Sequence, residues 1–337
     1  MVGLALLVPT ALLAMGDPAT ITTPVTVQNF ERAETDMYFS RFVQQGGLAK
    51  LMHNRNVASI DKQDTVRINR DTIYSAGIFD LDAGPVQVNL PDTADRYMSL
   101  MVVNQDHYVQ PVVYAPVQST FTREQVGTRY MMVMIRTLVD PKNTEDVKAV
   151  HVLQDAITIE QENTGSFKVP SWDPKPQKKI RDALKILAGL EEKPTPPRFG
   201  LKKDVSPISH LIGTAAGWGA APANAARYFP IYPKANNGKT VYSLTVKDVP
   251  VDGFWSISVY NKDGYYVKNK LGVYSINSVV AKPNADGSVT IQFGGCHNRI
   301  LNCIPTPPDW NYLLRLYRPA QVILDGIWKF PEAQQVK

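Results

Sequence analysis

The sequence contains little cysteine and little histidine, and it lacks the common signatures of nucleotide-dependent and zinc-dependent enzymes. Two cysteines and five histidines occur among 337 residues, and no two histidines stand at the spacing of a metal-ligand pair. No G-x-S-x-G, H-E-x-x-H, P-loop or G-x-G-x-x-G pattern is present. These absences argue against zinc proteases, nucleotide-dependent enzymes and hydrolases with a nucleophile elbow. We therefore expect no metal and no cofactor.

Dense clusters of basic residues are also lacking. The net charge is +5 and the pI is about 9.0, but the densest doublets, Lys178-Lys179 and Lys202-Lys203, have no aromatic residues between them. We therefore expect no nucleic-acid partner. Hydrophobic residues make up 44% and charged residues 20%, which is typical of a globular protein. A chain of this length most often forms two domains.

An uncharged stretch begins the sequence, but its apolar run is too short to cross a bilayer. Residues 4–13 are mostly apolar and are interrupted by Pro9-Thr10. Ala14-Met15-Gly16 then places small residues where signal peptidase requires them. We predict that residues 1–16 are a signal peptide, which implies a periplasmic or secreted protein with no membrane span after its removal. A buried N-terminal helix is the alternative.

The two cysteines stand seven residues apart, at Cys296 and Cys303. In an oxidising compartment they would close a small loop and stabilise the fold by roughly 2–3 kcal/mol. His297 is the only other soft ligand nearby, so a zinc site is weakly supported. A disulfide is the favoured interpretation.

Short strand patterns separated by turn signals occur at both ends of the chain. We predict strands at residues 65–69, 72–79, 86–90, 97–104, 112–115 and 130–138, and later at 241–246, 254–260, 289–293 and 313–317. Asp286-Gly287 predicts a hairpin that joins residues 279–281 to 288–293. Regular spacing of this kind favours antiparallel sandwiches or barrels.

Helical patterns separate the two groups of strands. They begin at Asn29, Asn143 and the Ser206-Pro207 pair, and a further amphipathic helix covers residues 179–190. The fold class is therefore α+β, mainly β, with two antiparallel β-sandwich-like (jelly-roll-like) domains and helices between them. We place a β-rich domain with a helical C-terminal part at residues 25–195, a helical connector at 196–235 and a β-sandwich domain at 236–337.

A polar triplet, Asn69, Arg70 and Asp71, opens the apolar strand predicted at residues 72–79. Polar groups at the mouth of a buried strand are costly unless they are paired, so they form either a site or a structural network. The fork of Arg70 suits a carboxylate ligand, and Asp71 could pair with Arg315. The alternative is that Arg70, Asp71 and Arg315 form a buried ion network that joins the two domains.

Other candidates for a site lie at strand ends and among the aromatic residues. His107 follows Asn104 at the end of a predicted strand, where it could act as a base near neutral pH. Tyr74 could donate a hydrogen bond, and Trp255 could line an aromatic pocket, although such a residue is more often part of a core. We expect Asp71, His107 and Tyr74 as catalytic residues and Asn69, Arg70, Asn104, Trp255 and Arg315 as substrate-binding residues.

Several motifs in the same order resemble those of a known two-domain family. Residues 69–74 (Asn-Arg-Asp-Thr-Ile-Tyr) resemble the signature of DUF1254, and residues 252–260, 311–319 and 324–331 resemble DUF1214. The resemblance covers nearly all of the chain after the leader and implies two β-rich, sandwich-like domains with helices, but no particular reaction. Many relatives carry Asn-Trp-Leu-Pro where this chain has Asn-Cys-Ile-Pro at 302–305, so a pocket contact by that tryptophan cannot be carried over.

Two functions of different classes fit these residues. The first is an exported hydrolase or lyase that acts on a small anionic or amphipathic organic molecule. The second is a non-catalytic periplasmic protein that binds a ligand or serves as a structural part of the envelope. A small-molecule ligand is the expected partner in either case, and a homo-oligomer is left open.

Overall fold

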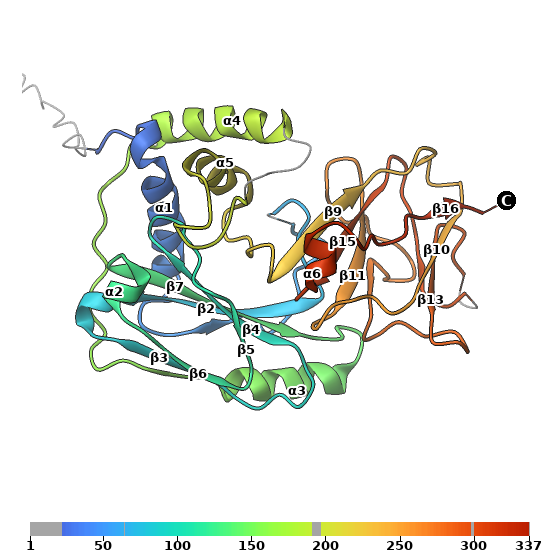
Figure 1. Cartoon of the computed structure of the whole chain (residues 1–337), viewed down its shortest axis with the longest axis horizontal. Coiled ribbons are helices and arrows are strands. Elements are labelled where there is room, and N and C mark those ends of the chain that lie inside the picture. The colour runs from blue at the N-terminus through green and yellow to red at the C-terminus, as the bar shows by residue number, and fades with distance from the viewer. Residues whose placement is uncertain (1–21, 64, 191–196, 298–299, 337) are drawn as a thin grey trace, which may run out of the picture.

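Two pairs of sheets form the molecule, one pair in each half of the chain, and a layer of helices covers the first pair (Figure 1). The computed structural model describes residues 22–63, 65–190, 197–297 and 300–336. The signal peptide predicted at residues 1–16 lies outside the described residues. Sheet is the dominant element and no barrel forms among the described strands, so the prediction of an α+β, mainly β fold with sandwich-like domains is confirmed.

The first half contains a five-stranded sheet in the order β1-β2-β7-β4-β5 and a three-stranded sheet in the order β6-β3-β8, both antiparallel. Their strands are β1 (Met52–His53), β2 (Thr72–Asp80), β3 (Val86–Leu90), β4 (Met98–Asn104), β5 (Val113–Tyr114), β6 (Val117–Phe121), β7 (Tyr130–Leu138) and β8 (Thr158–Glu160). Alternate residues of β2, β3, β4 and β7, including Phe79, Val88, Val102 and Met131, form one core between the two sheets. Because successive side chains of a strand point to opposite faces, every second residue of these strands points into the core between the two sheets.

Helices cover the remaining face of the five-stranded sheet. They are α1 (Phe30–Gln44), α4 (Pro174–Leu190) and α5 (Pro207–Gly217), which pack against one another, while α3 (Thr144–Asp155) lies on the opposite side of the molecule (Figure 1). Shorter helical turns are η1 (Val27–Asn29), η2 (Leu81–Ala83), α2 (Arg123–Val126) and α6 (Gln321–Leu324). The side chain of Asn143 caps α3 and that of Ser206 caps α5, as their sequences predict. No helix among the described residues is long and apolar enough to cross a bilayer.

The second half is a smaller sandwich. One sheet has the order β12-β11-β15-β9 and the other the order β14-β13-β10-β16. Their strands are β9 (Ala226–Ile231), β10 (Tyr242–Val246), β11 (Trp255–Tyr260), β12 (Ser275–Asn277), β13 (Val289–Phe293), β14 (Cys303–Ile304), β15 (Asn311–Tyr317) and β16 (Gln334–Gln335). Ile257, Leu314, Ile291 and Phe293 lie in the core between these sheets.

The sheet that contains β11 and β15 is covered on both faces. One face forms the core of the second sandwich, and the other lies against the first half of the chain, where Tyr317 joins the cluster around Ile78 and Met132. Every residue of β11 and β15 is consequently buried. The two halves therefore share a joint, which is the region where the polar triplet of β2 is found.

Three local features differ from the sequence predictions. Residues 65–69 form a turn instead of a strand, because this segment crosses onto the second half, where the Arg67 amide donates to the Gly264 carbonyl. Gly287 does make a turn with a φ of 81°, but the strand that follows it pairs with β10 and β14, not with residues 279–281. The stretch 196–235, expected as a helical connector, contains α5 and also β9, which pairs with β15.

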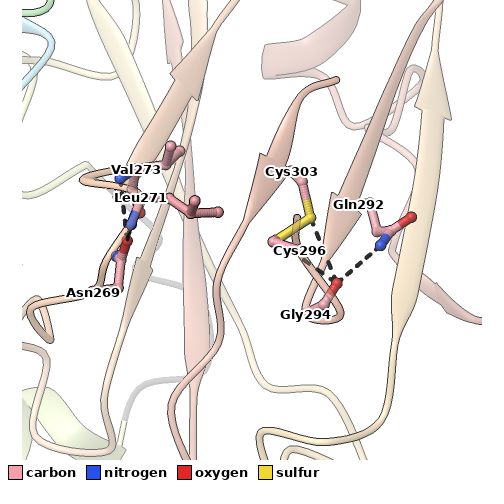
Figure 2. The surroundings of a disulfide bond; sticks show 7 residues. All are labelled: Asn269, Leu271, Val273, Gln292, Gly294, Cys296 and Cys303. Atoms are coloured by element: carbon pink, nitrogen blue, oxygen red, sulfur yellow. Dashed lines mark hydrogen bonds between the residues drawn. A yellow bond between two sulfur atoms is a disulfide. The ribbon is translucent and has the colours of Figure 1, made fainter. Parts of the chain in front are cut away.

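The disulfide between Cys296 and Cys303 is confirmed (Figure 2). Cys303 lies on β14, which pairs in parallel with the end of β13. The sulfurs of both cysteines lie near the carbonyl oxygen of Gly294, at 3.8 and 3.5 Å. The bond thus closes the loop that joins β13 to β14.

Candidate functional site

Two rows of polar and aromatic side chains meet at the joint between the halves. The strand register aligns one row across the five-stranded sheet, which consists of Tyr74, Arg136, Ser99 and Tyr114. It aligns the other row across the facing sheet, which consists of Asn277, Ser256, Arg315 and Tyr228. The rows are linked where Arg136 Nη1 donates to Tyr228 Oη at 3.4 Å. We call these eight residues the joint rows.

Asn69 connects the two halves of the chain at the beginning of β2. Its Oδ1 accepts a hydrogen bond from the Asp71 amide at 2.9 Å, which shapes the turn into the strand. Its Nδ2 lies 3.2 Å from Tyr74 Oη in the first half and 3.3 Å from Tyr317 Oη in the second. Asn69 therefore holds a phenol from each half in place.

Asp71 is a buried carboxylate with one unpaired oxygen. Its side chain is almost wholly buried, Oδ1 accepts from Asn277 Nδ2 at 3.3 Å, and Oδ2 has no hydrogen-bond partner among the described residues. The expected ion pair with Arg315 is not formed within the described part of the chain. The guanidinium of Arg315 instead donates to Ser258 Oγ, Tyr260 Oη and the Arg67 carbonyl. Such an unpaired buried oxygen is costly and calls for a further partner.

Arg136 is a buried cation without a carboxylate. It is 9% exposed, and no acidic residue of the described chain forms an ion pair with it. Its guanidinium makes only long contacts, at 3.4 Å to Tyr228 Oη and 3.4 Å to the Gly219 carbonyl. Because a guanidinium offers five N–H donors, most of its capacity is unused. Arg315, the other buried arginine of the joint rows, has three shorter hydrogen bonds, so Arg136 is the less well satisfied of the two.

Tyr74 lies opposite Arg136 and responds to its charge. Burial alone would raise the pKa of Tyr74, but the nearby Arg136 cation and hydrogen bonds from Thr72 and Asn69 outweigh burial and lower it. Burial raises the pKa of the neighbouring Tyr97. The phenol of Tyr74 therefore ionises more readily than burial alone would allow.

Arg70 lies beside the joint rows and does not point into them. It is partly buried, donates to the Ala58 carbonyl, and its guanidinium carbon lies 5.6 Å from the Tyr274 ring centroid. Its cation is therefore engaged by a backbone carbonyl and an aromatic face. The sequence suggested an anion ligand for Arg70, but the buried guanidinium among the joint rows is that of Arg136.

His107 lies under the helical layer, apart from the polar triplet. The Gly219 amide donates to its Nε2 at 2.9 Å, so the ring proton is on Nδ1 and is donated to Thr214 Oγ1 at 2.9 Å. Burial, followed by the neighbouring His210, holds the pKa of His107 well below its usual range. The carbonyl of the same residue, Gly219, accepts from Arg136. His107 therefore helps to position a residue that contacts the joint.

Asn104 and Trp255 also lie away from the joint rows. Asn104 Oδ1 accepts from the Asp106 and Tyr108 amides, and its Nδ2 donates to the Val126 carbonyl. Trp255 is in the core of the second sandwich, where its ring meets Phe330 edge-on. Residues at odd positions of β11 face that core and those at even positions face the joint, which puts Trp255 on the opposite side from Ser256.

Sequence reasoning missed Arg136, Tyr228 and Ser256. Arg136 was visible as the single charged residue within the predicted strand at 130–138, and a lone charge in an otherwise apolar buried strand is a signal of a site or an ion pair. Tyr228 lies within the stretch expected as a helical connector. Ser256 carries another buried oxygen without a partner among the described residues.

Two surface hollows lie elsewhere. One of about 500 Å³ adjoins β3, β6 and β8, and one of about 240 Å³ adjoins the disulfide. Neither is lined by the joint rows. No group of three metal-binding side chains gathers within the described ranges.

Two family models match the chain, one in each half. The family described as "Protein of unknown function (DUF1254)" matches residues 48–125, and the family described as "Protein of unknown function (DUF1214)" matches residues 233–321. The polar triplet lies in the first match and Arg315 in the second, whereas Arg136 lies in neither.

Two solved structures have a similar fold. The VPA0106 protein from Vibrio parahaemolyticus is 18% identical, with a TM-score of 0.68 over 92% of this chain and 98% of that chain. An uncharacterized protein from Burkholderia cenocepacia is 15% identical, with a TM-score of 0.52 over 92% of this chain and 88% of that chain. No curated protein matches the sequence. At these identities the likeness concerns the fold alone.

Proposed function

We propose that this DUF1254/DUF1214 domain-containing protein binds a small organic anion at the joint rows, where its two halves meet. Arg136 is the anchor of this ligand. A carboxylate placed on its free N–H donors would form the bidentate pair that a guanidinium favours.

One observation carries this proposal: Arg136 is buried without a carboxylate partner among the described residues. A buried cation is expensive unless a negative group compensates it. Tyr74 and Tyr228 offer hydroxyl groups beside it, which suit the oxygens of the same ligand. An organic anion would complete both the charge and the hydrogen bonding of the joint.

The chemistry best supported at this place is acid–base catalysis of a hydrolase or lyase type. Tyr74, with its lowered pKa, would exchange a proton with a substrate whose carboxylate rests on Arg136. Asp71, with its unpaired Oδ2, would act as a second proton-handling group on the side of Asn277. Neither step requires a redox cofactor.

A non-catalytic ligand-binding or structural role in the envelope is the second candidate. It is favoured by the contacts of Asn69 and Arg70. Their polar groups already have partners within the protein, on both sides of the joint. The disulfide supports a periplasmic or secreted location under either candidate, because such bonds persist in oxidising compartments.

Thermal-shift and calorimetric titration with a panel of small mono- and dicarboxylates tests the binding proposal. We expect a carboxylate that raises the melting temperature of the wild type, has no effect on Arg136→Met and binds Arg136→Lys more weakly. Arg96→Met is the matched control, because it removes an arginine that is ion-paired with Asp146 away from the joint. A carboxylate response that survives in Arg136→Met would contradict the proposal.

Tyr74→Phe separates catalysis from binding. The variant should keep carboxylate affinity within a few-fold of the wild type and lose turnover of the bound compound, followed by NMR of the reaction mixture. If wild type and Tyr74→Phe both leave the bound compound unchanged over extended incubation, the non-catalytic candidate is the correct one.

A further inference from the structure

The outer side of α4 exposes large apolar residues at its C-terminal end. Ile186 is 70% exposed, Leu187 47% and Leu190 75%. The opposite side of the helix packs into the helical layer through Leu184 and Ile180. In Figure 1, α4 is the outermost helix of this layer. Single exposed apolar residues are ordinary, but three within one and a half turns of a helix form a patch.

Exposed lysines precede this apolar patch along α4. Lys175, Lys178, Lys179 and Lys185 are exposed on α4. The one acidic residue of the helix, Asp182, pairs with Lys178 at 2.6 Å. Arg181 turns inward to Glu34 of α1. The outward charge of α4 is therefore positive.

The helical repeat sorts these residues along one outward stripe. At 100° per residue, Lys175, Lys179, Ile186 and Leu190 fall on one side of α4, opposite the buried Leu184. The stripe is basic over the first turns and apolar over the last two. A basic polar part next to an exposed apolar part is the pattern of helices that lie in a membrane interface.

The N-terminal side of the described chain meets the fold beside this helix. The Thr23 amide donates to the Ser171 carbonyl at 2.7 Å, and the Asp173 amide donates to the Thr23 carbonyl at 2.9 Å, immediately before α4. The apolar residues 4–13 precede this point in the sequence.

From these observations we infer that the outer face of α4 docks on an anionic lipid bilayer. Ile186, Leu187 and Leu190 enter the boundary between headgroups and acyl chains, and the lysines of the preceding turns contact lipid phosphates. The exposed lysines of α4 favour an anionic bilayer as the occupant. A second copy of the chain, whose apolar end would meet this one in an antiparallel contact, is the alternative that light scattering tests below. This docking is independent of ligand binding at the joint.

Vesicle co-sedimentation tests the inference, with the full chain and with the chain that begins at Asp17, which keeps every described residue. Both should bind vesicles of phosphatidylethanolamine and phosphatidylglycerol, bind phosphatidylcholine vesicles at least about tenfold more weakly, and dissociate as salt is raised. The double variants Ile186→Ser/Leu190→Ser and Lys175→Glu/Lys179→Glu should each reduce binding of the chain from Asp17 at least about tenfold.

A matched control is available on α3, on the opposite side of the first half. Val152 is 67% exposed and the Lys148 side chain is 66% exposed, so Val152→Ser/Lys148→Glu makes equivalent changes and should leave vesicle binding unchanged. Equal melting temperatures of all variants would show that the fold is retained.

Two outcomes would overturn the inference. One is that the chain from Asp17 fails to bind anionic vesicles, or binds them equally well in both α4 double variants. The other is that light scattering shows a dimer that the Ile186→Ser/Leu190→Ser variant dissociates, which would assign the patch to a second copy of the chain.

Discussion

Tyr74 and Arg136 are cross-strand partners on β2 and β7, and the guanidinium carbon of Arg136 lies 5.5 Å from the Tyr74 ring centroid. A buried cation and a half-buried phenol thus face the second half of the molecule together. No acidic residue of the described chain pairs with Arg136, and its charge lowers the pKa of the Tyr74 phenol. The ionisation of Tyr74 is consequently coupled to any anion that binds at the joint.

This coupling predicts the behaviour of Tyr74 in a titration. In Arg136→Met the cation is removed while burial remains, so the pKa of Tyr74 should rise. The measurement is the phenolate absorbance as a function of pH, taken as the difference between each protein and its Tyr74→Phe counterpart. Arg96→Met should leave the Tyr74 midpoint where it is in the wild type. An unchanged midpoint in Arg136→Met would contradict the coupling.

The link between Asn69 and Tyr317 predicts a measurable share of the stability of the joint. Tyr317→Phe removes the hydroxyl that Asn69 Nδ2 contacts across the joint, and the free energy of unfolding should fall by about 1 kcal/mol. Urea denaturation followed by tryptophan fluorescence measures this difference. Tyr232→Phe removes a hydroxyl that accepts from Arg67 Nη2 at an exposed position and should change the stability by less than about 0.5 kcal/mol. Equal effects of the two substitutions would argue against a structural role for the Asn69 contact.

The disulfide should stabilise the second sandwich by closing a short loop. Replacing Cys296 and Cys303 together by serine is expected to lower the free energy of unfolding by roughly 2–3 kcal/mol on the loop-entropy estimate. Reduced wild type should denature at the same urea concentration as the double variant, whereas the oxidised wild type should require more urea. A double variant as stable as the oxidised protein would show that the bond contributes nothing to equilibrium stability.

His107 predicts a pH dependence of stability. Its pKa is held well below the ordinary value of about 6.5 in the folded state, so below that pH the unfolded chain takes up a proton that the folded chain does not. Its contribution to stability is therefore complete above about pH 6.5 and declines as the pH falls. The difference in unfolding free energy between wild type and His107→Gln should accordingly shrink from about pH 8 to about pH 5. His210 is present in both proteins and cancels, and a constant difference would contradict the prediction.

Much of the secondary structure was predictable because it depends on local chemistry. The strands β3, β7 and β13 begin and end at the residues predicted from alternation and flanking turn residues. The caps at Asn143 and Ser206 follow from side chains that accept hydrogen bonds from nearby amides. These signals involve residues within a few positions of one another.

The joint could not be predicted because it depends on register between distant strands. Arg136 meets Tyr74 and Tyr228 only after β2, β7 and β9 have taken their places. Trp255 was expected in an aromatic pocket, with a core position as the alternative. Both faces of β11 are buried, so burial alone cannot tell which face a residue occupies. His107 has the sequence context of a base, but its two ring nitrogens are engaged by Thr214 and Gly219, which lie more than one hundred positions away.

The sheet that contains β11 and β15 has no solvent-facing side, and this limits how the chain can be divided. If the second half were produced alone, Leu313, Arg315 and Tyr317 would be exposed to water on an extended, largely aromatic surface. Such a surface favours self-association over a stable monomer. The two halves are therefore poor candidates for exchange as modules, because each half needs a partner that carries the matching residues of the joint.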